Sequence, residues 1–180
     1  MRSLKGKLLL DGGKLAGSPF HRSVVLICEH DAEGAFGLVL NRRTEHVVGE
    51  AIGVPVTDFV KDLPVFWGGP LQPRALSVLL GEPSKSDANV MPGLRLAHTL
   101  DDLVEPKFPV PAQVKFFAGY AGWSPGQLDD EMKEKEWLTH PASLDLVFHP
   151  QTEELWKAIL CNLGPEYRLL AEAPDNVSWN

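Results

Sequence analysis

The sequence has few of the residues that build disulfide scaffolds and metal sites. Only two cysteines occur among 180 residues, Cys28 and Cys161, and neither belongs to a CxxC motif. The six histidines include no i,i+4 pair and no HExxH motif, so we expect neither a metal nor a cofactor. Two distant cysteines fit a reducing compartment better than a secreted scaffold, and we therefore expect a cytoplasmic protein.

Long apolar segments and runs of basic residues are also missing. No apolar stretch approaches the roughly 20 residues of a membrane span, and the run at residues 8–10 is too short for a signal peptide. The net charge is −7, and no Lys/Arg cluster is dense enough to follow a phosphate backbone. We expect no membrane anchor and no direct nucleic-acid binding.

The length and composition indicate one globular unit. A chain of 180 residues predicts a single domain over residues 1–180. Hydrophobic residues make up 44% and charged residues 23%, which is typical of folded proteins. Blocks of helix-forming residues alternate with blocks of β-branched residues, and this favours a mixed α/β, α+β-like architecture.

The periodicity of apolar residues places the secondary-structure elements. We expect strands at residues 8–10, 23–29, 35–40, 65–67, 76–80, 94–97, 114–118 and 144–148. We expect helices at residues 46–53, 99–105, from 124 onward, 152–163 and 166–171. The second and third strands flank a short turn and should form an antiparallel hairpin.

The open end of this hairpin gathers polar residues. If the turn centres on Ala32 and Glu33, residues 22 and 42 lie near each other at the open end. Arg22, Asn41 and Arg42 would then form a rim that could bind an anion or an acidic partner. The alternative is a charged sheet rim that only keeps an edge soluble.

Cys28 and His30 are the candidate reactive pair. They lie two residues apart on one predicted strand, which would direct both side chains to one face. A Cys–His dyad could then carry nucleophilic chemistry. The alternative is a buried cysteine that packs as a small apolar residue beside a solvated histidine.

Residues 122–126 match the G-x-S-x-G pattern of a serine-hydrolase elbow. The residue after the serine must donate its backbone N–H to the oxyanion, and Pro125 has none. Ser124 is better explained as the N-cap of a helix, with Pro125 in the first helical position and Gln127 completing a capping box.

Tyr120 and Trp123 lie just before this predicted helix, between glycines. Aromatic side chains beside a helix N-terminus could line a small-ligand pocket or a partner surface. The alternative is that both rings are packing groups.

Three segments together resemble a known family. They are residues 20–30 (FHRSVVLICEH), 34–42 (GAFGLVLNR) and 119–128 (GYAGWSPGQL), with GGP at residues 68–70 between them. This combination resembles the bacterial YqgE/AlgH family. The resemblance implies a branched, largely antiparallel β-sheet that is curled into a pseudo-barrel and flanked by helices. It also implies a cytoplasmic bacterial protein with a transcriptional-regulator label, and it supplies no catalytic residues.

One departure from the family pattern is Arg43, which stands where members usually have proline. We expect a non-enzymatic binding or regulatory module that engages a protein or small ligand through Arg22, Asn41 and Arg42, or through Tyr120 and Trp123. An enzyme that uses Cys28 and His30, and a regulator that acts on DNA, are the alternative hypotheses.

Overall fold

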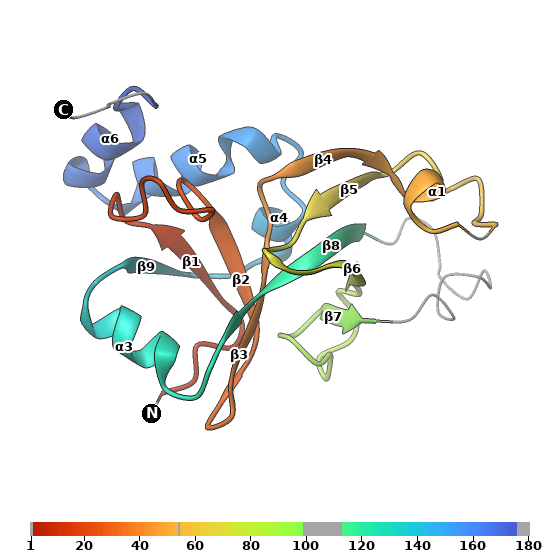
Figure 1. The fold of residues 1–180 in the computed structure, drawn as a ribbon, viewed down its shortest axis with the longest axis horizontal. Coiled ribbons are helices and arrows are strands. Elements are labelled where there is room, and N and C mark those ends of the chain that lie inside the picture. Colours follow the sequence, from red (N-terminus) through yellow and green to blue (C-terminus); the bar gives the residue numbers. More distant parts are fainter. Residues whose placement is uncertain (1, 54, 99–112, 176–180) are drawn as a thin grey trace.

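The computed structural model describes residues 2–53, 55–98 and 113–175, and its centre is a nine-stranded sheet (Figure 1). The strands are β1 (Lys7–Asp11), β2 (Val24–Asp31), β3 (Gly34–Val39), β4 (Arg43–Val47), β5 (Pro64–Trp67), β6 (Leu71–Gly81), β7 (Leu94–Ala97), β8 (Gln113–Trp123) and β9 (Trp137–Pro141). The described helices are α1 (Val48–Ala51), α3 (Gln127–Lys133), α4 (Leu144–Val147), the 3₁₀ turn η1 (Thr152–Glu154), α5 (Leu155–Leu163) and α6 (Pro165–Glu172).

The sheet branches at β8. Its main path runs β4-β5-β8-β3-β2-β1-β9, and β6 pairs with β8 off this path and carries β7. The pair of β5 with β8 is parallel, while the other strand pairs are antiparallel. β8 crosses the middle of the molecule in Figure 1 and joins the two arms of the sheet. The branched, largely antiparallel architecture implied by the family resemblance is confirmed, and the curled sheet does not close.

Glycines permit the branch. Gly119 lies within β8 at φ 73°, and a Cβ built there would approach the carbonyl oxygen of Gly69 to 2.5 Å. A Cβ on Gly69 would lie 2.1 Å from the backbone carbon of Tyr120. The GGP segment therefore serves the close approach of two backbones, which only glycine allows here.

The curled sheet separates three apolar clusters. The largest lies inside the curl, where side chains of both arms, such as Leu26 and Phe117, pack with Leu155 and Ile159 of α5. A second cluster lies on the other face of β2 and β3 and is covered by Leu128 of α3. The third lies outside the β5–β6–β8 arm and is covered by Val48 of α1. Each strand of the centre is thus buried on both faces, as the unbroken apolar run in β2 predicts.

Two elements differ from the sequence expectation. The predicted strand at residues 144–148 is the short helix α4, because the Ser143 side chain accepts a hydrogen bond from the Leu146 backbone N–H at 3.2 Å and caps it. The helix expected from residue 124 ends at Lys133, and Trp137–Pro141 instead forms β9, which pairs with β1.

The start of α3 also differs from the prediction. The helix begins at Gln127 after Gly126, which adopts the left-handed conformation that glycine favours. The Ser124 hydroxyl donates to Gln127 Oε1 at 3.2 Å, and the Ser124 backbone N–H donates to the same oxygen at 3.0 Å. Only the half of the capping box made by the glutamine side chain is therefore present.

The predicted helix at residues 99–105 lies outside the described residues. The hairpin of β2 and β3, the short helix α1 and the two C-terminal helices are confirmed near their predicted places. Within the part of the chain that the structure describes, no helix is both long and apolar enough to cross a membrane.

Candidate functional site

The hairpin register brings the predicted rim residues together. Val25 pairs with Val39, so Arg22 and Arg42 lie at the same open end of the β2–β3 hairpin. Asn41 joins the two chains there, because its Oδ1 accepts from the Val24 N–H at 2.9 Å and its Nδ2 donates to the Arg22 carbonyl at 2.9 Å. The rim predicted from the sequence thus exists as a geometric unit.

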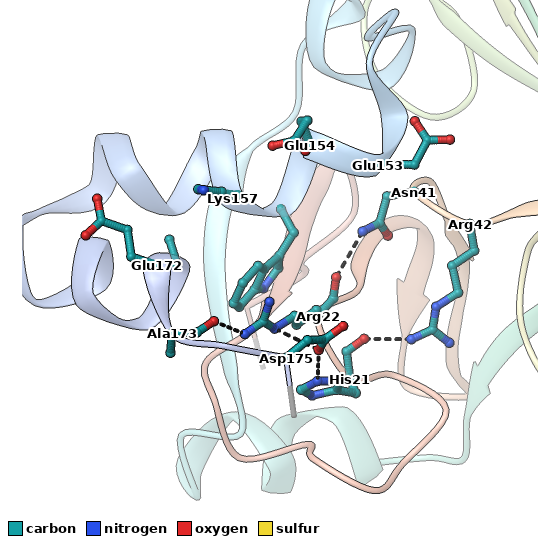
Figure 2. A pocket seen from close by; sticks show the side chains of 12 residues that line it. His21, Arg22, Asn41, Arg42, Glu153, Glu154, Lys157, Glu172, Ala173 and Asp175 are labelled. Carbon is teal, nitrogen blue, oxygen red and sulfur yellow. Dashed lines mark hydrogen bonds and ion pairs between the residues drawn. The ribbon is translucent and has the colours of Figure 1, made fainter. Parts of the chain in front are cut away.

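This rim is one wall of a pocket of about 510 Å³ (Figure 2). The opposite wall comes from the 3₁₀ turn, α5 and α6, which lie more than 100 residues away in the sequence. The residues lining the pocket are His21, Arg22, Asn41, Arg42, Glu153, Glu154, Trp156, Lys157, Ala171, Glu172, Ala173 and Asp175. Its volume lies within the range of small-molecule sites in proteins.

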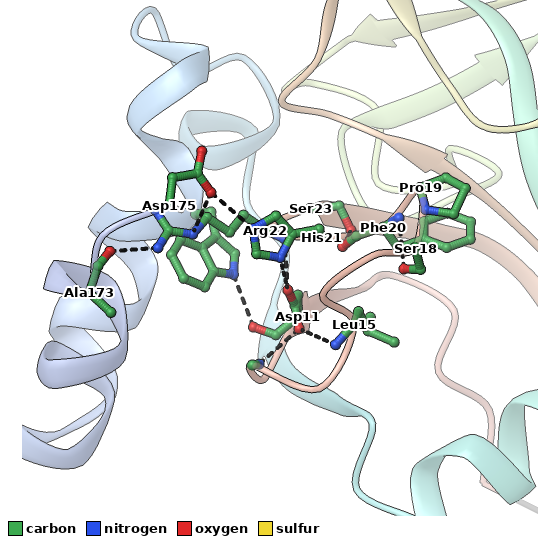
Figure 3. A network of polar contacts seen from close by, with 12 residues as sticks. Asp11, Leu15, Ser18, Pro19, Phe20, His21, Arg22, Ser23, Ala173 and Asp175 are labelled. Carbon is green, nitrogen blue, oxygen red and sulfur yellow. Dashed lines mark hydrogen bonds and ion pairs between the residues drawn. The ribbon is translucent and has the colours of Figure 1, made fainter. Parts of the chain in front are cut away.

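A buried carboxylate supports the floor of the pocket (Figure 3). Asp11 is fully buried at the end of β1. Its Oδ1 accepts from the backbone N–H groups of Gly13 at 2.8 Å and Leu15 at 3.2 Å, while Oδ2 accepts from the Arg22 N–H at 2.7 Å. The Trp156 indole N–H donates to the Asp11 carbonyl at 3.0 Å and ties α5 to the same point.

Arg22 is held in a left-handed backbone conformation, with φ 53°. This conformation is uncommon for a residue with a side chain, and the Asp11 carboxylate and the Asn41 amide hold the backbone in place from both sides. This backbone conformation directs the guanidinium of Arg22 over the Trp156 ring, with Cζ 5.0 Å from the ring centroid. Arg22 is therefore a structural element of the pocket wall as well as a charge.

His21 and Arg22 bind the side-chain carboxylate of Asp175 in the pocket. Asp175 Oδ1 lies 2.9 Å from His21 Nε2 and 3.3 Å from Arg22 Nε, and Arg22 also donates to the Ala173 carbonyl at 2.6 Å. The hydrogen bond from His21, and then the charge of Arg22, lower the pKa of Asp175. His21 Nδ1 lies 3.5 Å from Asp11 Oδ2 and completes this contact chain.

Arg42 has a different environment from Arg22. Its guanidinium donates to the backbone carbonyls of Pro19 and His21, and its Cζ lies 5.2 Å from the Trp67 ring centroid. Among the described residues it forms no ion pair, and burial lowers its pKa. Arg42 is thus a half-buried cation without an acidic partner in the described structure, beside an open pocket.

Arg43 points away from this rim. Its Nε lies 3.7 Å from Glu153 Oε1, and its Cζ lies 5.8 Å from the Phe66 ring centroid. It lines a second, smaller cavity on the other side of the Glu153 contact. Arg43 therefore belongs to a different cavity from Arg22 and Arg42.

Cys28 and His30 do not share a face, which corrects the prediction from strand alternation. The register of β2 against β3 shifts between Ile27 and Glu29, and this bulge reverses the alternation. Cys28 packs fully buried in the inner cluster, where burial raises the pKa of its thiol. His30 instead accepts from the Leu4 N–H at 3.0 Å through Nδ1 and lies 3.9 Å from Asp129.

Tyr120 and Trp123 also lie on opposite faces, and both belong to β8 rather than to a loop. Tyr120 stacks on Phe36, with ring centroids 4.9 Å apart, against the inner cluster. Trp123 packs in the α3-covered cluster and donates its indole N–H to Glu131 at 2.8 Å. The structure does not bring these two side chains into one pocket.

Several residues in or beneath the pocket were not predicted from the sequence. Asp11 belongs to a DGG turn signal, and Asp175 lies 154 residues from its partner His21. Glu153, Glu154 and Lys157 read as the solvated face of a helix. Within the described ranges, no group of three or more His, Cys, Asp or Glu side chains is arranged to hold a metal ion.

The comparison with known proteins identifies the family. A family model described as AlgH-like matches residues 8–168. The chain belongs to the AlgH-like family. A UPF0301 protein of Chlorobaculum parvum is 38% identical, with 97% of this chain and 95% of the relative covered. A UPF0301 protein of Chlamydia muridarum is 35% identical, with 98% and 95% covered.

Two solved structures are similar to this chain. The solution structure of the AlgH protein from Pseudomonas aeruginosa is 26% identical, has a TM-score of 0.72 and covers 97% of this chain and 98% of its own. The crystal structure of protein DIP2367 from Corynebacterium diphtheriae is 24% identical, has a TM-score of 0.73 and covers 96% and 94%. The second similarity is one of fold. The resemblance read from the sequence motifs is therefore confirmed.

Proposed function

We propose that this AlgH-like protein is a non-enzymatic binding module whose pocket at Arg22 and Arg42 takes a small ligand carrying a carboxylate. The observation that carries the proposal is Arg42, a half-buried cation without an acidic partner among the described residues. Burial makes an isolated cation unfavourable, so an anion that reaches it gains more than it would in water.

The binding of Asp175 supports the same chemistry. His21 and Arg22 hold its carboxylate in the pocket, which indicates that this wall accepts a carboxylate group. The facing wall carries the acidic residues Glu153, Glu154 and Glu172 together with Lys157, opposite the arginines of the rim. Because both signs of charge line the pocket, a ligand that also carries an amino or hydroxyl group would fit it better than a bare anion.

The alternative functions have less support. A Cys28–His30 dyad would need the two side chains on one face, and the bulge in β2 separates them. Regulation by direct contact with DNA stays a prediction of the family label, and the net charge of −7 disfavours it.

A binding measurement on the full chain tests the proposal. Citrate serves as the carboxylate probe, and its affinity is measured by calorimetry for the wild type and for Arg42→Gln. Because a hydrogen bond to a charged group contributes about 1.5–3 kcal/mol, the variant should bind roughly tenfold to a hundredfold more weakly. The control is Arg74→Ala, which removes an exposed arginine of β6 outside the pocket.

Glutamine keeps part of the side chain that lies over Trp67, so the variant should remain folded, and circular dichroism checks this. Equal affinity of the folded Arg42→Gln variant and the wild type, or an equal loss in Arg74→Ala, would contradict the proposed site.

A further inference from the structure

Lys115 is a buried amine outside the pocket just described. It lies on β8 on the inner face of the curled sheet and is 6% exposed. Its Nζ donates to the carbonyl oxygens of Leu40 at 2.8 Å and Val147 at 3.1 Å, and lies 4.2 Å from the Phe66 ring centroid. Among the described residues no carboxylate lies within ion-pair distance, which is unusual for a buried lysine.

This environment favours the neutral amine. Burial, and then the charge of Arg43, lower the pKa of Lys115 to about 7 against the opposing charge of Glu153. Two hydrogen bonds to carbonyl groups use N–H donors and leave the nitrogen lone pair free in the neutral form. A lysine whose lone pair is available near neutral pH is a nucleophile toward carbonyl carbon.

A cavity of about 270 Å³ adjoins the amine. Lys115, Phe66 and Arg43 line it together with Phe148 and His149. Arg43 and Lys115 both flank the Phe66 ring, since the Arg43 Cζ lies 5.8 Å from its centroid. The Arg43 ion pair with Glu153 is long and exposed, so a ligand carboxylate can compete for the guanidinium.

We propose that Lys115 captures the carbonyl group of a small 2-oxo acid as an imine, while Arg43 binds the acid's carboxylate. The nitrogen lone pair forms a bond to the carbonyl carbon, and the π electrons of the carbonyl move to its oxygen. The two amine hydrogens leave with that oxygen as water, and the second carbon–nitrogen bond completes the imine. The step needs no oxidant or reductant, and water is its only other product.

The inference concerns a different cavity and a different ligand group from the binding site at Arg42. A lysine that only ties the Leu40 and Val147 carbonyl groups together would show the same hydrogen bonds. The two roles differ in one observable, because a purely structural amine does not react preferentially with an added carbonyl compound.

Reductive trapping tests the proposal on the full-length protein. The protein is incubated at neutral pH with pyruvate and sodium cyanoborohydride, which reduces an imine to a stable amine. Intact-mass analysis and peptide mapping then locate the adduct. We expect one adduct per chain to form first, at Lys115, at least about tenfold faster than at the exposed Lys157. Trapping at Lys115 that is absent, or no faster than at Lys157, overturns the proposal.

Variants separate the two proposed roles. Arg43→Gln should slow pyruvate trapping at Lys115 by at least about tenfold. Trapping of acetaldehyde, which lacks a carboxylate, should slow much less, because it is affected only through the rise in the Lys115 pKa when the Arg43 charge is lost. An equal effect on both compounds overturns the assignment of Arg43. Lys115→Met should lose the fast adduct, but the wild-type peptide map decides the question even if this variant does not fold. The Arg42→Gln variant should trap pyruvate normally, so failure of one proposal is distinguishable from failure of the other.

Discussion

At the residue scale, the two arginines of the pocket, Arg22 and Arg42, have different roles. Arg22 is bound on both sides by protein groups, since its backbone N–H reaches Asp11 and its guanidinium reaches Ala173 and Asp175. Within the described part of the chain, Arg42 contacts only the backbone carbonyls of Pro19 and His21 and the Trp67 ring. Removing Arg22 should therefore disturb the pocket wall itself, whereas Arg42 is the better probe of ligand binding.

The titration of Lys115 gives a prediction about stability. Its pKa of about 7 in the folded protein lies below the ordinary 10.5, so the unfolded chain binds this proton more tightly. The cost of the buried charge is fully present below about pH 7 and disappears as the pH rises toward 10.5. Relative to Lys115→Met, the wild-type free energy of unfolding should rise by up to about 1.4 kcal/mol per pH unit in this window.

Urea unfolding of both proteins across this pH range measures the difference. The charged groups around the amine, Arg43, Glu153 and His149, are present in both proteins, so their own titration largely cancels. A difference between wild type and variant that stays constant from neutral to alkaline pH would show that Lys115 keeps an ordinary pKa.

Part of the candidate site is predictable from the sequence at this scale. The turn at Ala32 and Glu33 brings Arg22 and Arg42 near each other at the open end of the hairpin, and the bulge between Ile27 and Glu29 then shifts the register by one residue. Asp11 and Asp175 are not predictable in this way, because their contacts with His21 depend on how distant segments pack. The prediction that Cys28 and His30 share a face was also wrong, because a bulge leaves no clear signal in an apolar run.

At the element scale, β8 organises the fold because it pairs with three strands. It meets β5 and β6 near Phe117 and meets β3 near Ala121, with Gly119 between these regions. The backbone of Gly69 passes so close to Gly119 that neither position has room for a side chain. The two arms of the sheet therefore depend on glycines that a sequence reading marks only as a turn.

Two alanine substitutions test this role of glycine. Gly119 and Gly17 both have positive φ, 73° and 82°, but a Cβ on Gly17 meets nothing within 4 Å. Gly17→Ala should cost only the backbone strain of about 1–2 kcal/mol. Gly119→Ala adds a clash with the Gly69 carbonyl oxygen and should cost more than about 4 kcal/mol or prevent folding. Chemical denaturation compares them, and similar losses in the two variants would contradict the close approach.

Secondary structure was predictable where apolar periodicity is strong, as in β2 and α5. It was not predictable at residues 144–148, where an apolar sequence typical of a strand forms a helical turn capped by Ser143. The prediction also failed at Trp137–Pro141. This segment follows an acidic helix in the sequence but pairs with β1, whose residues 8–11 are buried. In both cases a local cap or a tertiary pairing outweighs intrinsic propensity.

At the scale of the whole molecule, the curled sheet explains why the pocket forms where it does. The β1–β2 loop and the end of β3 meet α5 and α6 at one side of the inner apolar cluster. The β1–β2 loop and the C-terminal helices α5 and α6 thus share one site (Figures 1 and 2). The branch at β8 was implied by the family resemblance and not by the residue pattern, because strand pairing of this kind is a property of the complete sheet.

The central claim is that this pocket binds a carboxylate-bearing ligand, and an NMR titration tests it most directly. Amide spectra of the isotope-labelled full chain are recorded while citrate is added. The account predicts saturable shifts concentrated at His21, Arg22, Asn41 and Arg42 and at the facing residues of α5. Shifts that are absent from these residues, or that are equally large around the exposed Arg74 on β6, would contradict it.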